Sequence, residues 1–93
     1  MAVLIDLTHA RRARRMMHIL VERHGIRHFL SGDREAAFRI DPAKLRWAVG
    51  LCCEWVTLRT GSEASTELEE WLTTDLRRLL IRELAEAMVH AGY

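Results

Sequence analysis

Proline and glycine are scarce in this sequence of 93 residues, which has one proline and five glycines. Both residue types interrupt helices, so their scarcity leaves room for long uninterrupted helices. No run approaches the roughly 20 apolar residues that cross a bilayer. The apolar start at residues 2–5 is too short for the core of a secretory signal peptide. We therefore expect neither a membrane segment nor a cleaved leader.

Cysteine is equally scarce, and the two cysteines, Cys52 and Cys53, are neighbours. Adjacent cysteines do not make a disulfide framework, so we expect a reducing, cytoplasmic setting. They also make a poor pair of metal ligands, because structural zinc sites separate paired cysteines by about two to four residues. His24 and His28 are four residues apart, but we expect Gly25 to break the helix between them and to spoil a shared face. The sequence therefore predicts no metal site and no cofactor.

Catalytic signatures are missing as well. The sequence contains no Gly-x-Ser-x-Gly nucleophile elbow, no P-loop and no dinucleotide-binding glycine fingerprint. Arg46 and Glu54 carry groups that helical enzymes use, but nothing in the sequence singles them out. We therefore expect a protein that is not an enzyme.

The composition that is present is that of a globular domain. Hydrophobic residues make up 49% and charged residues 29% of the chain, and its length fits a single domain, residues 1–93. The net charge of +1 hides an asymmetry, because residues 1–61 hold eleven Lys and Arg against six Asp and Glu, whereas residues 62–93 hold three Arg against seven acids. The two segments either complement each other inside the fold or meet separate partners.

The hydrophobic periodicity predicts a mainly α fold, a small bundle of three principal helices over about residues 8–24, 42–60 and 66–91. The second helix has the strongest boundary signals, with Asp41 as N-cap, Pro42 at the first helical position and Gly61 after the last turn. The third helix is expected to start at Ser65 or Thr66.

The connector at residues 26–40 has two interpretations. Apolar runs on both sides of the turn-prone residues 31–33 are consistent with a short β-hairpin. A short helical turn at residues 33–38 is equally defensible, because periodicity does not distinguish strand from helix in runs this short.

The first helix carries a cluster of arginines opposite its apolar arc: Arg11, Arg12, Arg14 and Arg15. Cations in the first half of a helix oppose its dipole, and two that are four residues apart repel each other. This arrangement is locally unfavourable, which indicates an anion supplied from elsewhere. One interpretation is contact with nucleic-acid phosphates. The other is a solvated face, or pairing with the acidic start of the third helix.

The second helix is apolar over most of its circumference. One side is formed by Leu45, Val49, Cys52 and Val56, and the other by Trp47, Leu51, Trp55 and Leu58. In the third helix, Trp71 and Val89 lie off the main apolar stripe. A three-helix monomer has too little surface to cover all of these side chains, so we expect a homodimer or a dedicated protein partner to cover Trp47, Leu51, Trp55, Leu58 and Trp71.

Together these features predict a small non-enzymatic protein–protein interaction or regulatory module. It is expected to be oligomeric, with the Trp-containing helix side as its assembly surface and the Arg-rich face of the first helix as a second contact surface. The alternative is a small nucleic-acid-binding protein that contacts phosphates through Arg11, Arg12, Arg14 and Arg15.

Overall fold

The computed structural model describes residues 7–32, 39–61, 63–90 and 92. Within these ranges the chain forms three long α-helices, α1 (Leu7–His24), α2 (Pro42–Thr60) and α3 (Thr66–His90), and one short 3-10 helix, η1 (Ile26–Phe29). This confirms the prediction of a mainly α fold with three principal helices. None of the helices in the described ranges has the length and apolarity needed to cross a membrane.

The ends of α2 carry the signals expected from the sequence. The carboxylate of Asp41 accepts a hydrogen bond from the backbone N–H of Ala43 at 2.9 Å, and Pro42 occupies the first helical position. Gly61 ends the helix with a φ of 71°, a left-handed conformation that suits glycine, and its N–H donates to the carbonyl of Thr57. These local interactions satisfy backbone groups that a bare helix end leaves unpaired.

The other two helices also have recognisable ends. Ser65 precedes α3, and its hydroxyl oxygen accepts a hydrogen bond from the N–H of Leu68 at 3.1 Å, as an N-cap does. Gly25 follows α1 with a φ of 78°, and its N–H donates to the carbonyl of Val21. Because a positive φ strains any side chain with a Cβ, glycine fixes where α1 ends.

In the described part of the connector between α1 and α2, the first of the two runs considered for a β-hairpin is not a strand. Residues 26–29 form η1 instead, and an antiparallel bridge then pairs Leu30 with Ile40, with hydrogen bonds from the N–H of Ser31 to the carbonyl of Arg39 and from the N–H of Asp41 to the carbonyl of Phe29. The physical reason is Phe29, which is completely buried and which the 3-10 turn brings into the core directly after α1. The helical turn proposed at residues 33–38 lies outside the described residues.

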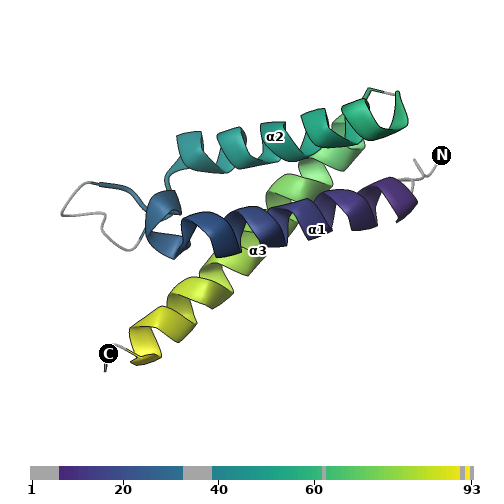
Figure 1. Ribbon diagram of the computed structural model, residues 1–93. Coiled ribbons are helices and arrows are strands. Elements are labelled where there is room, and N and C mark those ends of the chain that lie inside the picture. The colour runs from purple at the N-terminus through teal and green to yellow at the C-terminus, as the bar shows by residue number, and fades with distance from the viewer. Residues whose placement is uncertain (1–6, 33–38, 62, 91, 93) are drawn as a thin grey trace.

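The three helices pack against one another around one core. α1 and α2 lie side by side and antiparallel, and α3 crosses the pair obliquely (Figure 1). The side of α2 that carries Leu45, Val49, Cys52 and Val56 is buried, so it is this side that faces the core. In α3, the buried residues are Leu68, Leu72, Leu76, Leu79 and Leu80.

The second half of α3 extends past the core. Leu80 is the last buried residue of this helix, although the helix continues to His90. Because α3 crosses at an angle, its last turns diverge from α1 (Figure 1). This divergence opens a groove between the two helices.

Candidate functional site

The structure divides the arginine cluster of α1 between two sides of the helix. Arg14 faces α3, where its Nε lies 3.3 Å from a carboxylate oxygen of Asp75. Arg12 and Arg15 instead line a groove between α1 and α2, and Arg11 is exposed. Asp75 lies in the middle of α3 and not at its acidic start, so this ion pair differs from the pairing considered above. The phosphate-binding role of the four arginines stays a prediction.

The groove between α1 and α2, hereafter the basic groove, combines cationic and apolar side chains. It has a volume of about 520 Å³ and is lined by Arg12, Arg15, Met16, Ile19, Trp55 and Arg59. The antiparallel packing places the first turns of α1 beside the last turns of α2, so that residues far apart in the sequence share this groove. None of the described residues that line it carries a carboxylate. The groove therefore unites part of the Arg-rich face with part of the Trp-containing side.

Trp55 is the aromatic centre of the basic groove. The guanidinium carbon of Arg59 lies 5.5 Å from the centroid of its ring, which is within cation–π distance. The indole is half-buried and also packs against the core, so its position is fixed from one side. On the α1 side of the groove Ile19 is 48% exposed. An apolar contact is thus available to a ligand beside three guanidinium groups.

The other residues predicted as an interface lie in different surroundings. Leu51 is partly buried against the core, and so is Trp71 on α3. Leu58, near the end of α2, is 79% exposed. Trp47 is 38% exposed and lies at the opposite end of α2, against η1 and the end of α1. The assembly role of these residues stays a prediction.

Trp47 belongs to an aromatic cluster that the sequence analysis missed. The imidazoles of His24 and His28 stack with centroids 4.8 Å apart, and the indole of Trp47 meets both rings edge-on at 5.3 and 5.1 Å. The expectation that Gly25 would separate the two histidines is therefore wrong. Gly25 does end α1, but η1 begins at once and turns His28 back beside His24. The i, i+4 spacing was the signal that could have found this cluster.

This environment favours the neutral form of His28. Burial lowers its pKa from the usual value of 6.5, and the nearby charges of Lys44 and His24 lower it further. Its Nε2 atom is buried and has no hydrogen-bond partner among the described residues. Nor does the described part of the chain contain a group of three or more His, Cys, Asp or Glu side chains placed to hold a metal ion.

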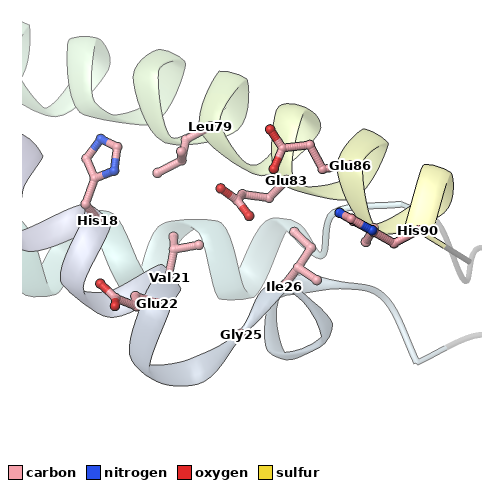
Figure 2. A pocket seen from close by; sticks show the side chains of 10 residues that line it. His18, Val21, Glu22, Gly25, Ile26, Leu79, Glu83, Glu86 and His90 are labelled. Carbon is pink, nitrogen blue, oxygen red and sulfur yellow. The ribbon is translucent and has the colours of Figure 1, made fainter.

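The groove between α1 and α3, hereafter the bipolar groove, was not predicted. Its larger half has a volume of about 480 Å³ and is lined by the carboxylates of Glu22, Glu83 and Glu86 (Figure 2). The carboxylate of Glu83 lies between the two helices (Figure 2). The apolar side chains of Val21, Ile26 and Leu79 also line this acidic half.

The smaller half of the bipolar groove has the opposite charge. It has a volume of about 210 Å³, and its charged lining residues are Arg14, Arg78, Arg82 and Asp75. His18 and Leu79 line both halves, so the two halves are neighbours along α1 and α3. Among the residues that line the groove, arginine precedes glutamate on each helix: Arg14 precedes Glu22 on α1, and Arg78 and Arg82 precede Glu83 and Glu86 on α3. Only the crossing of the two helices brings the like charges together.

The surroundings of both thiols favour the protonated form. Burial, followed by the neighbouring Cys53, raises the pKa of Cys52 to about 12. Burial, followed by Glu69, also raises the pKa of Cys53. Since the thiolate is the reactive form, both cysteines are poorly reactive near neutral pH.

The chain matches no protein-family model, and the comparisons found no similar curated protein and no similar solved structure.

Proposed function

We propose that the protein is a small non-enzymatic interaction module that binds an acidic, amphipathic segment of a partner protein in the basic groove. The observation that carries this proposal is the composition of that groove, in which Arg12, Arg15 and Arg59 surround the apolar surface of Met16, Ile19 and Trp55. A groove between two helices is a common receptor for an amphipathic helix, which lays its apolar side into the groove.

The chemistry of the lining residues favours a protein ligand with carboxylates beside its apolar stripe. A guanidinium group binds a carboxylate through two parallel hydrogen bonds, which fixes geometry as well as charge. Tryptophan and arginine are the residues that most often dominate binding energy at protein interfaces. The flexible side chain of Met16 adapts to the shape of the bound side chains.

A cytoplasmic location agrees with this proposal. Cys52 and Cys53 are free thiols, and a protein without disulfides needs no oxidising compartment.

Nucleic-acid binding is the second candidate, and the neighbourhood of Trp55 favours it. A half-buried indole beside guanidinium groups can stack on a base while the guanidinium groups contact phosphates. The division of the arginine cluster weighs against this candidate, because Asp75 already pairs with Arg14. A phosphate backbone would then meet Arg12 and Arg15 without the other arginines of the run.

The proposal is tested with three fluorescent probes. One is a synthetic helical peptide with a leucine stripe flanked by glutamates, the second is the same composition in scrambled order, and the third is a single-stranded oligonucleotide. We expect the first peptide to bind, with an affinity that falls by about tenfold or more in the Arg15→Glu and Trp55→Ala variants. Fluorescence anisotropy measures binding, and circular dichroism verifies that each variant is helical.

Arg23→Glu is the matched control, because Arg23 is an exposed arginine of α1 that does not line either groove. Its affinity for the stripe peptide is expected to equal that of the unmodified protein. Equal binding of the scrambled peptide would contradict the proposal. Oligonucleotide binding that weakens with salt and is lost in Arg15→Glu would replace it with the nucleic-acid candidate.

A further inference from the structure

The charges of the bipolar groove are arranged in a way that fits a second copy of the same groove. Its acidic half presents Glu22, Glu83 and Glu86, and its basic half presents Arg78 and Arg82 together with the paired Arg14. Within the described residues, no ion pair joins these glutamates to Arg78 or Arg82. Both sets of charges are therefore available to an external partner whose charges run in the opposite order.

We propose that the chain forms a two-fold symmetric homodimer through the bipolar groove. In such a dimer each contact occurs twice, and the same surface of both copies must be complementary to itself. A two-fold axis that passes near His18 and Leu79, which line both halves, places the basic half of one copy against the acidic half of the other. This proposal does not depend on the function proposed for the basic groove.

The two halves also differ in size and shape, as this dimer requires. Arg78 and Arg82 are exposed, long side chains one turn apart on α3, whereas the acidic half is the roomier hollow, about 480 Å³ against 210 Å³. The arginines of one copy can therefore enter the acidic half of the other. There their aliphatic stems would meet the apolar side chains of Val21 and Leu79, and their guanidinium groups the carboxylates.

The basic groove does not suit this symmetric role. Among the described residues its lining has three arginines and no carboxylate, so two copies facing each other there would repel. The molecule thus has one groove that fits a like copy and one that fits a different, acidic ligand.

The experiment uses two charge-reversed variants of the full chain. Arg78→Glu/Arg82→Glu makes both halves acidic, and Glu22→Arg/Glu86→Arg makes the acidic half largely basic; all four positions are exposed. We expect the unmodified protein to dimerise and each variant alone to dimerise at least about tenfold more weakly, because each reversed pair occurs twice. An equimolar mixture of the two variants is expected to form a heterodimer. Sedimentation equilibrium from micromolar to millimolar protein measures all three samples.

The heterodimer is the decisive readout, since a variant that merely unfolds cannot regain association on mixing. Arg12→Glu/Arg15→Glu is the matched control, with the same change of charge in the other groove, and it is expected to dimerise like the unmodified protein. A monomeric unmodified protein, variants that dimerise normally, or a mixture without heterodimer would overturn the proposal. The peptide-binding test above measures the affinity of a ligand for the basic groove alone. Either proposal can therefore be contradicted while the other stands.

Discussion

His28 links the aromatic cluster to pH. Because burial, Lys44 and His24 lower its pKa in the folded chain, the unfolded chain takes up the proton first as the pH falls through about 6.5. The stability that depends on neutral His28 is therefore complete above this pH and is lost as the pH falls toward the lower pKa of the folded chain. We expect urea unfolding to show this decline between pH 8 and pH 5, and to show a smaller decline in His28→Phe.

The phenylalanine retains an aromatic ring between Phe29 and Trp47 but does not titrate. His18→Gln serves as the control, because His18 is an exposed imidazole that has no part in the aromatic cluster. An equal decline in the His28→Phe variant and the unmodified protein would show that this cluster does not cause the pH dependence.

The same residue shows where reasoning from sequence stopped. Gly25 was correctly predicted to end α1, but the direction of the chain after a helix end is not encoded in the periodicity of that helix. η1 begins directly after Gly25, and it places the imidazole of His28 against that of His24. Gly25 thus predicts where α1 ends but not the path that the chain takes after it.

At the scale of the helix, Gly50 inside α2 and Gly61 directly after its last residue should respond in opposite ways to alanine. Gly61 has a φ of 71°, and Gly61→Ala is expected to reduce the free energy of unfolding by about 1 kcal/mol, because a Cβ strains the left-handed conformation. Gly50 lies inside α2, and a Cβ there meets no atom within 4 Å. Gly50→Ala is expected to increase the free energy of unfolding by about 0.5–1 kcal/mol.

Urea unfolding of both variants measures these changes. The two substitutions add the same atom to the same helix, so they differ only in backbone conformation and place. A change of the same sign in both would contradict the assignment of Gly61 as the end of α2.

The helices themselves were predictable because their signals are local. Asp41, Pro42, Gly61 and Ser65 act through neighbours in the sequence, and the structure shows each in its expected place. The grooves were not predictable, since they depend on the angle at which α3 crosses α1. The partial pairing of the charged segments, through Arg14 and Asp75, likewise needs the three-dimensional arrangement.

For the whole molecule, the core ends about halfway along α3. Substitutions at buried and at exposed positions of this helix should therefore change the free energy of unfolding by very different amounts. Leu76 is completely buried, so Leu76→Ala is expected to reduce the free energy of unfolding by about 2–5 kcal/mol. Ile81 is 54% exposed, and Ile81→Ala is expected to change it by less than about 1 kcal/mol.

Urea denaturation at a fixed, low protein concentration is the measurement, so that self-association does not add to the apparent stability. A large loss in Ile81→Ala would mean that the second half of α3 is packed more tightly than its exposure indicates. Similar small losses in both variants would contradict the position of the core.

The position of α1 between two grooves has a consequence for how its sequence can change. With about 100° between successive residues, Ala13 and Met17 point to the core, Arg12 and Ile19 to the basic groove, and His18 and Glu22 to the bipolar groove. These three directions together go all the way round the helix. An ordinary surface helix has one side on which substitutions accumulate freely, whereas the middle turns of α1 have none, so substitutions in this helix are tolerated best at positions such as Arg23 that line neither groove.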